Sequence, residues 1–176
     1  MKLRLFHAKI LSAPDAEPFD GELHIEGGKI VYAGKSGSAK NFSADREVDC
    51  GGNLLMSGFC NAHAHSAMCL FRGIADDLPL EEWLYDRIFP LEKHLTQDDV
   101  YWGTMLQIAE YVRNGISCVA DMYFYPESVV AAAQNANLCL ALCYPSNSYT
   151  KGNVLAEIEK NYRLYSTMSD RIRYFP

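Results

Sequence analysis

Residues 57–65 read Ser-Gly-Phe-Cys-Asn-Ala-His-Ala-His. The first part of this stretch, residues 58–62, is short and largely apolar, which predicts a strand that ends in two histidines. Side chains at positions i and i+2 of a strand project to the same face, so His63 and His65 are expected to lie side by side. Two neutral imidazoles suit zinc, iron or nickel. Because a His-x-His pair also occurs on ordinary surface strands, the pair alone leaves a metal site and a polar surface strand both open.

Strands and helices alternate downstream of the histidines. Further strands are expected at residues 116–122, 138–143 and 171–175. Four strands alternating with helices predict βα units on a parallel sheet, and barrels of this kind carry their active sites at the carboxyl ends of the strands. A complete (β/α)8 TIM-type barrel takes about 250 residues. Residues 57–176 are therefore expected to form the first half of an α/β barrel, about four βα units, and the protein is expected to be truncated.

The helices of this half are predicted from caps and apolar stripes. Residues 80–88 form a helix that Pro90 interrupts. Thr96 is the N-cap of a second helix, which Gly115 ends, and Pro126 opens a third. The residues expected to face the core are Tyr101, Met105, Ile108 and Val112 in the second helix, Val129, Val130 and Ala133 in the third, and Leu155, Ile158, Tyr162 and Tyr165 in the last.

The residues upstream of the histidines read as short strands. Leu3, Leu5 and His7 alternate with charged neighbours, residues 22–25 make a second strand, and Gly-Gly at 27–28 predicts a tight hairpin turn into residues 29–33. A polar stretch at residues 36–45 predicts a loop. The chain is therefore expected to consist of a small β module over residues 1–56 and a barrel part over residues 57–176.

Composition excludes several classes of function. The chain has 176 residues, of which 49% are hydrophobic and 22% charged, the balance of a packed globular protein. Its 16 Lys and Arg against 22 Asp and Glu give a net charge of −6, which argues against nucleic acid as a partner. No run approaches about 18 apolar residues, so no membrane span is predicted. The six cysteines form no Cys-x-x-Cys pair and follow no secretion signal, which predicts buried, reduced thiols in a cytoplasmic protein.

The run from Val48 to His65 resembles the entry to the barrel in the metal-dependent amidohydrolase superfamily. Residues 68–73, 77–84 and 90–92 are more specific. They are similar to the deaminases acting on 5′-methylthioadenosine and S-adenosylhomocysteine, and to related chlorohydrolases and guanine deaminases. Residues 114–116 and 121–124 extend the similarity, which covers essentially the whole chain as the N-terminal portion of such an enzyme.

This resemblance implies a fold and a metal site. The N-terminal strands would be half of a small β-sandwich that later residues complete. His63 and His65 would be the first two ligands of one catalytic divalent metal, zinc or alternatively iron. In the family the other ligands, the general base and an assisting histidine come from later strands, so no catalytic residue is expected before Pro176. The chain alone is expected to be inactive, because the metal would lack at least two ligands.

Two residues of the helical segment are implied to bind substrate. In the matching deaminases the glutamate of Pro-x-Glu, here Glu92, accepts hydrogen bonds from ribose hydroxyls; the alternative is an exposed helix-end residue paired with Lys93 or Arg87. Trp83 either walls the substrate pocket or packs as an ordinary aromatic on the barrel rim. Asp121, at the end of the second barrel strand, is expected to be structural rather than catalytic.

The resemblance implies hydrolytic deamination of an adenosine-type nucleoside by metal-activated water, with a purine nucleoside or a related amine-bearing heterocycle as partner. The sequence departs from the family pattern in two places. Ser57 stands where the family has proline, and residues 142–145 read Leu-Cys-Tyr-Pro where the deaminases carry an arginine, which leaves a smaller nucleoside open. The alternatives are another amidohydrolase activity (a chlorohydrolase, or a guanine or cyclic-amide hydrolase) and a non-catalytic half-barrel that self-associates into a homo-oligomer through open strand edges.

Overall fold

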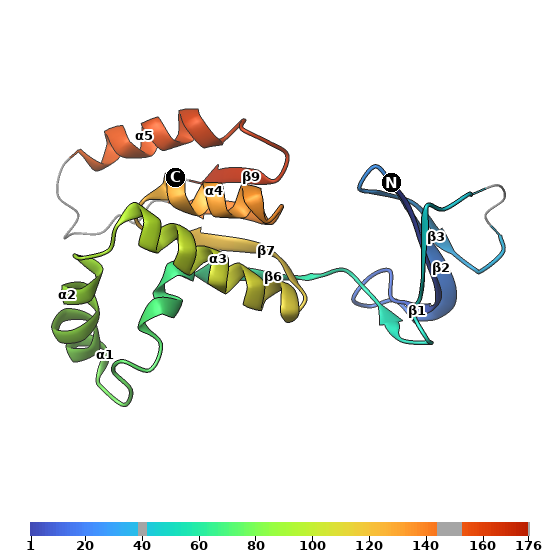
Figure 1. Ribbon diagram of the computed structural model, residues 1–176, viewed down its shortest axis with the longest axis horizontal. Coiled ribbons are helices and arrows are strands. Elements are labelled where there is room, and N and C mark those ends of the chain that lie inside the picture. Colours follow the sequence, from blue (N-terminus) through green and yellow to red (C-terminus); the bar gives the residue numbers. More distant parts are fainter. Residues whose placement is uncertain (39–41, 144–152, 176) are drawn as a thin grey trace. The chain divides into compact units, whose positions relative to one another are not determined.

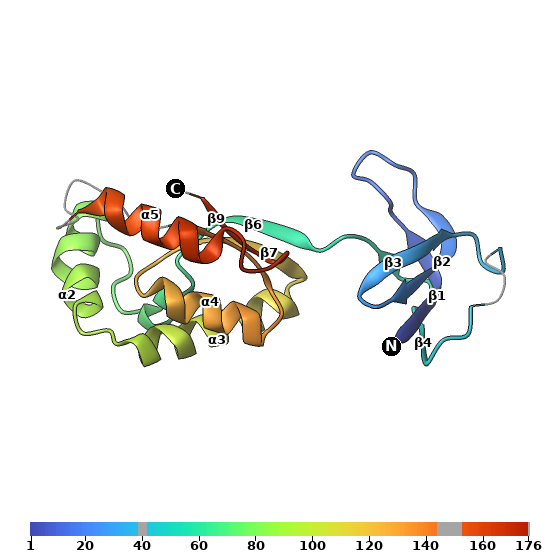
Figure 2. The ribbon, with the colours of Figure 1, turned by 90° about the horizontal axis from the view of Figure 1, so that it is seen from above.

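The computed structural model describes residues 1–38, 42–143 and 153–175. The chain divides into two compact units, Met1–Ser57 and Gly58–Pro176. Over its described residues the first unit is built of strands alone, whereas the second alternates strands and helices (Figure 1, Figure 2). Within the described part of the chain, no helix is long and apolar enough to cross a membrane.

The N-terminal unit is a five-stranded sheet. Its strands are β1 (Lys2–Ile10), β2 (Phe19–Glu26), β3 (Lys29–Gly34), β4 (Arg46–Asp49) and β5 (Leu54–Leu55). The order is β3-β2-β1-β4, with β5 also paired to β1; β1, β2 and β3 are antiparallel, and β4 and β5 run parallel to β1. The predicted hairpin is confirmed: Gly27 and Gly28 have φ angles of 59° and 79°, and Glu26 pairs with Lys29.

Two short strands of this unit were not expected, and two other predictions for it remain open. β4 and β5 were not predicted, because strands of four and two residues carry too little alternation to be recognised. The polar loop expected at residues 36–45 lies partly outside the described residues. The described residues of this unit form one sheet, so the expected β-sandwich stays a prediction.

A buried polar group links β1 and β2. Glu22 is 2% exposed and accepts hydrogen bonds from Arg4, at 2.5 Å from Nη2 and 3.1 Å from Nε. Its other oxygen lies 3.1 Å from Nε2 of His24, which is also 2% exposed and stacks on Phe42 with ring centroids 4.2 Å apart. The buried carboxylate therefore has partners at both oxygens, which offsets the desolvation that burial imposes on it.

The C-terminal unit is a four-stranded parallel sheet with helices between the strands. The strands β6 (Phe59–Ala64), β7 (Ile116–Met122), β8 (Cys139–Cys143) and β9 (Ile172–Phe175) pair in sequence order. The helical segments are η1 (Ser66–Phe71), α1 (Leu80–Glu82), η2 (Trp83–Ile88), α2 (Phe89–Glu92), α3 (Gln97–Arg113), α4 (Pro126–Asn135) and α5 (Val154–Tyr165). The predicted βα alternation is confirmed, and so are all four predicted strands, each within two residues of its expected bounds.

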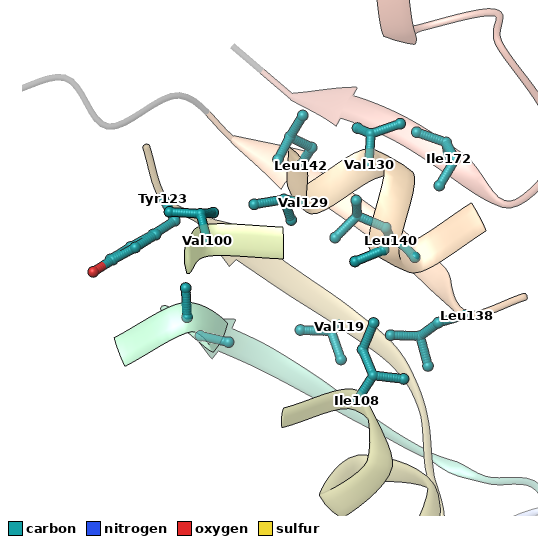
Figure 3. Packing of buried hydrophobic residues seen from close by; sticks show 14 of the residues in the cluster. Val100, Ile108, Val119, Tyr123, Val129, Val130, Leu138, Leu140, Leu142 and Ile172 are labelled. Atoms are coloured by element: carbon teal, nitrogen blue, oxygen red, sulfur yellow. The ribbon is translucent and has the colours of Figure 1, made fainter. Parts of the chain in front are cut away.

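Helices α3, α4 and α5 cover one face of this sheet, where a single buried cluster forms (Figure 2, Figure 3). The cluster joins strand residues to helix residues: Val119, Leu140, Leu142 and Ile172 from the strands, Val100 and Ile108 from α3, and Val129 and Val130 from α4. The intervening strand residues Cys118 and Ala120 point the other way and are only half-buried. Within the described residues, the second face of the sheet therefore carries no helix layer.

The six cysteines are all free, as expected, but their burial was predicted wrongly. Cys60 is exposed and the other five are half-buried. Cys60 pairs in register with Cys118, and Cys118 with Cys139, so these three residues form a row on the face without helices. Their exposure follows from that position, because apolar sequence neighbours do not reveal which face of a strand is covered.

The core-facing stripe predicted for α3 is confirmed in part: Ile108 is buried, and Tyr101 and Met105 pack half-buried against the cluster. The predicted Val112 is 63% exposed, whereas the buried residues of α3 are Val100, Gly103, Thr104, Ile108 and Tyr111. Gly103 lies close against η1: a Cβ added there would lie 3.1 Å from the carbonyl oxygen of Ala67. A glycine adds nothing to a hydrophobic pattern, so the pattern did not reveal Gly103 as a buried residue.

The other helix predictions have mixed outcomes. Both ends of α3 are confirmed: Thr96 and Asp99 form a reciprocal capping box, and Gly115 follows with a φ of 73°. The buried face of α4 is also confirmed. In α5 the prediction is wrong for Leu155 and Tyr162, which are 77% and 51% exposed. The buried residues of α5 are Asn161 and Tyr165. Because Asn161 is polar, the hydrophobic pattern of the sequence does not reveal which face of α5 is buried.

Candidate active site

An extra residue in β6 decides where the two histidines point. Asn61 and Ala64 pair with β7 residues that are only two positions apart, so β6 advances three residues while β7 advances two. Ala64 belongs to the buried cluster under the helices, and so His63 and His65, which flank it, project from the opposite face. If residues 61–64 alternated regularly without this irregularity, His63 would share the face of Asn61 and point into the helix layer.

The two imidazoles lie against each other. Their ring centroids are 4.9 Å apart and the rings are nearly perpendicular, at 84°. Nδ1 of His65 lies 2.6 Å from the carbonyl oxygen of Met122. Because a carbonyl oxygen only accepts, Nδ1 carries the proton and Nε2 keeps a free lone pair. A histidine whose second nitrogen donates to a carbonyl is oriented in the manner of metal-ligating histidines.

Asp121 supports the same turn from the end of β7. Its side chain is 1% exposed, and its two carboxylate oxygens accept from the backbone N–H of Ser66 at 3.2 and 3.3 Å. Burial raises the pKa of Asp121, while the hydrogen bonds from Ser66 and the nearby His65 act in the opposite direction. Asp121 thus fixes the backbone directly after His65, which agrees with the structural role expected for it.

Glu92, the last residue of α2, is half-buried. Its Oε1 accepts a 2.9 Å hydrogen bond from the phenol of Tyr123, which directly follows β7. Burial raises the pKa of Glu92, and the hydrogen bond from Tyr123 and the nearby His65 oppose this rise. The partner of Glu92 is therefore a buried tyrosine from across the unit, and not the neighbouring Lys93 or Arg87.

Trp83 begins η2 and lines a pocket of about 280 Å³. The other lining residues come from η1, the turn after it and the end of η2, and they include Met68, Phe71, Arg72, Asp76 and Ile88. Neither Glu92 nor the two histidines line this pocket. Trp83 therefore lies in the wall of a cavity that the histidines do not line, so its role in substrate binding stays a prediction.

A π-helical turn separates Trp83 from Glu92. The break predicted at Pro90 is wrong: η2 is a π-helix that runs directly into α2, and its wider turn carries the chain past the N–H that proline lacks. Trp83 and Glu92 are nine residues apart and would lie on opposite sides of a regular α-helix. The π-helical segment between them changes this rotation, because a π-helix has more residues in each turn.

His63 and His65 can supply only part of a metal shell. Among residues 1–38, 42–143 and 153–175, no group of three or more His, Cys, Asp or Glu is placed to hold a metal ion. Catalytic zinc sites use three protein ligands with an open position, and structural sites use four. The pair fits two of these positions, because both rings are nitrogen donors and one has its tautomer fixed by Met122.

Sequence reasoning missed the residues that hold the candidate site together. Met122 and Tyr123 stand in the stretch Asp-Met-Tyr-Phe at residues 121–124, which directly follows a predicted strand. A polar aromatic at a strand end is the one signal that could have suggested a role. Nothing in the pattern indicates that Met122 meets His65, 57 residues away, or that Tyr123 meets Glu92, 31 residues away.

Comparison with known proteins gives the family. Residues 54–172 match the model described as the Amidohydrolase family. The chain belongs to the amidohydrolase family. This amidohydrolase chain is 48% identical over 127 residues to a 5-methylthioadenosine/S-adenosylhomocysteine deaminase of Syntrophobacter fumaroxidans, a match that covers 71% of the chain and 29% of that protein. It is 45% identical over 125 residues to a 5′-deoxyadenosine deaminase of Methanococcoides burtonii, covering 71% of the chain and 28% of that protein.

A solved structure extends the comparison of this amidohydrolase to the fold. The chain is similar to an adenosine deaminase from Xanthomonas campestris with bound zinc, with a TM-score of 0.86 and 27% sequence identity. The match covers 98% of this chain and 41% of that one. The predicted superfamily is thus confirmed, and the α/β class is confirmed for part of a barrel. The amidohydrolase chain spans less than a third of the length of the two curated relatives.

Proposed function

We propose that the full-length protein containing this chain hydrolytically deaminates an adenosine-type nucleoside of the 5′-methylthioadenosine or S-adenosylhomocysteine class. The observation that carries the proposal is the imidazole pair at the end of β6. The extra strand residue aims His63 and His65 away from the core, and Met122 fixes one nitrogen of His65. The names of the two curated deaminases and the zinc in the adenosine deaminase structure support it.

The two histidines would hold one divalent cation, with zinc as the first candidate and iron as the second. When bound, such a cation lowers the pKa of water from about 15.7 to about 7 and supplies hydroxide at neutral pH. His65 would ligate through Nε2, because its Nδ1 donates to Met122. Asp121 keeps the backbone after His65 in place through the N–H of Ser66. The remaining ligands and the acid–base groups are assigned to residues outside these 176.

Glu92 and Trp83 would bind the nucleoside. Tyr123 occupies one acceptor direction at Oε1 of Glu92, which leaves the other lone pairs of the carboxylate for the two ribose hydroxyls. Trp83 would contribute a flat apolar wall to its pocket, against which a heterocycle or a thioether can pack. A small-molecule partner and a cytoplasmic location belong to the same proposal.

Zinc binding and turnover test the proposal together in the full-length protein. His63→Ala and His65→Ala are each expected to weaken zinc binding by about a hundredfold or more, because each removes a ligand. Ammonia release from 5′-methylthioadenosine should then fall below detection. His94→Ala removes an exposed histidine outside the site and should leave both measurements unchanged. Full turnover by the double variant H63A/H65A would contradict the proposal.

A substrate panel tests the chemical class. Ammonia release should be faster from 5′-methylthioadenosine, S-adenosylhomocysteine or adenosine than from guanine, and no chloride should be released from a chlorotriazine. Faster turnover of either of the last two compounds would replace the adenosine-type substrate by another amidohydrolase activity. The 176-residue chain assayed alone with added zinc should show no turnover.

A second candidate function rests on the ends of the parallel sheet. β6 and β9 are the first and last strands in the pairing order, so each has one edge without a partner among the described residues. Phe59 on β6 and Phe175 on β9 are 59% and 53% exposed. Open edges favour association with another strand, so the 19.8 kDa chain alone would act as a self-associating half-barrel. Light scattering should then show a dimer or larger species, and a stable monomer would exclude this function.

A further inference from the structure

Tyr123 combines a buried ring with a directed hydroxyl group. It is 3% exposed and belongs to the buried cluster of the C-terminal unit. Figure 3 shows its ring at the margin of the cluster, with the phenol oxygen directed away from the aliphatic side chains of Val129 and Leu142. Packing on the ring leaves little freedom to the two side-chain torsions of a tyrosine. The hydroxyl is therefore held at a fixed place by the core.

This hydroxyl reaches Glu92. It lies 2.9 Å from Oε1, and it must donate, because a carboxylate only accepts. Burial, followed by the charge of Glu92, raises the pKa of Tyr123 far above its ordinary value, so the phenol keeps its proton at neutral pH. A hydrogen bond to an ionised acceptor in a water-poor setting is shorter and stronger than one between neutral groups.

The position of Glu92 in the chain makes such a partner useful. It is the last residue of α2, a four-residue helix that follows the π-helical turn. A glutamate side chain loses rotamer freedom when it is fixed, and this loss opposes binding. A hydrogen bond that already exists in the free protein restricts the side chain beforehand, so less conformational entropy is lost when a ligand binds. The half-buried carboxylate of Glu92 is thus preorganised by a rigid donor.

We propose that Tyr123 is a positioning residue that holds the Glu92 carboxylate in the orientation that accepts the sugar hydroxyls of a nucleoside. The inference rests on the function proposed above for Glu92 and adds a residue to it. Tyr123 acts through Glu92 and does not itself touch the substrate. Its hydroxyl therefore sets the affinity for the sugar diol and leaves the chemical step to other groups.

The test is Tyr123→Phe in the full-length protein, which removes one oxygen and keeps the buried ring. A hydrogen bond to a charged group contributes about 1.5–3 kcal/mol, so KM for adenosine should rise by about tenfold or more. The value of kcat should stay near that of the unchanged protein, because a contact made equally in the ground state and the transition state affects KM alone. The same variant should leave KM for 2′,3′-dideoxyadenosine unchanged, because that nucleoside has no diol.

Tyr125→Phe is the matched control. Its hydroxyl donates to the carbonyl oxygen of Leu95 at 3.1 Å, so this variant loses a phenol hydrogen bond from the same segment without touching Glu92. Thermal unfolding of both variants shows whether either has lost its fold. Glu92→Gln and the double variant Y123F/E92Q complete a cycle in which the effects on KM should be strongly non-additive.

The outcomes separate this inference from the proposed function. If the unchanged protein deaminates neither nucleoside, the proposed function fails and the role of Tyr123 fails with it. If it is active but Y123F has no larger effect on KM than Y125F, only the role of Tyr123 is overturned. Equal increases in KM for adenosine and its dideoxy analogue, or additive effects in the cycle, would also overturn it.

Discussion

His24 in the N-terminal sheet and the pair His63 and His65 at the end of β6 place the same side chain in opposite settings. His24 is 2% exposed, its Nε2 lies 3.1 Å from Glu22, and its ring stacks on Phe42. His63 is exposed, His65 is half-buried, and Nδ1 of His65 donates to a main-chain carbonyl. The first setting holds a sheet together, and the second leaves a nitrogen lone pair for a ligand.

The carboxylates of the two units differ in the same way. Burial alone would raise the pKa of Glu22, but the hydrogen bonds and charge of Arg4 lower it below its ordinary value. Burial raises the pKa of Glu92, and Tyr123 offsets only part of that rise. A structural carboxylate is thus fully paired with a cation, whereas the candidate binding carboxylate keeps unused acceptor capacity. Paired groups should affect stability, and unpaired groups should affect ligand binding.

Exchanging two neighbouring residues of β6 should have the largest effect. The double variant H63A/A64H moves one imidazole to the position of Ala64, which belongs to the buried cluster under the helices. Zinc affinity of the full-length protein, measured by competition with a chelator, should fall by about a hundredfold or more. Ala62→Gly leaves both imidazoles in place and should bind zinc like the unchanged protein. A folded H63A/A64H variant with unchanged zinc affinity would show that the face on which the ring lies does not decide metal binding.

Glu22→Gln should act on stability alone. It leaves Arg4 and His24 beside a neutral amide, and the free energy of unfolding should fall by about 2 kcal/mol, less than for a fully buried pair because Arg4 is partly exposed. Glu47→Gln removes an exposed partner of the same arginine and should lower it by less than about 1 kcal/mol. Denaturant unfolding checks both values. A loss of zinc affinity in E22Q would break the contrast between the two histidine settings.

Asp121→Leu should weaken zinc binding by about tenfold, because it removes the acceptor for the N–H of Ser66 and loosens the turn after His65. Asp121→Asn keeps one oxygen acceptor in the same place and should have the smaller effect. Isothermal titration with zinc measures both. If the two variants bind equally, the hydrogen bond to Ser66 does not orient the site.

The pH dependence of stability should give the smallest effect, with opposite signs for the two carboxylates. Because the pKa of Glu22 is lowered on folding, its contribution is present above the ordinary glutamate value, about 4.3, and is lost as the pH falls through the folded value. The pKa of Glu92 is raised on folding, so the folded state binds the proton more readily than the unfolded state. The contribution of Glu92 to the free energy of unfolding is therefore present at low pH and is lost as the pH rises through its folded-state pKa.

Unfolding measured between pH 3 and pH 7 separates the two contributions. E22Q should show a flatter loss of stability toward acid than the unchanged protein, whereas Glu92→Gln should steepen it. If the free energy of unfolding depends on pH in the same way in both variants, the environments of Glu22 and Glu92 do not shift their pKa values in opposite directions.

Much of the fold could be predicted because its signals are local. The Gly27-Gly28 hairpin, the cap at Thr96 and the bounds of β7 each depend on residues within a few positions of one another. The burial of Gly103 in α3 could not be predicted, because glycine carries no hydrophobic signal. The π-helical turn before Pro90 was also hidden, because proline in a helical pattern predicts a break.

The candidate site was only half predictable. The spacing of His63 and His65 indicated that the rings share a face, but regular alternation from Asn61 would have placed that face against the helices. Only the paired register of β6 and β7 reveals the extra residue. The contacts of Met122 and Tyr123 join segments far apart in the sequence, and packing rather than local pattern brings them together.

A zinc-edge anomalous diffraction map of the full-length protein would show whether His63 and His65 bind the metal. We expect one zinc peak about 2.0–2.1 Å from Nε2 of His65 and from a ring nitrogen of His63. Nδ1 of His65 should still donate to the carbonyl oxygen of Met122. A zinc peak that contacts neither imidazole, or a map without zinc in which the two rings point apart, would contradict the account.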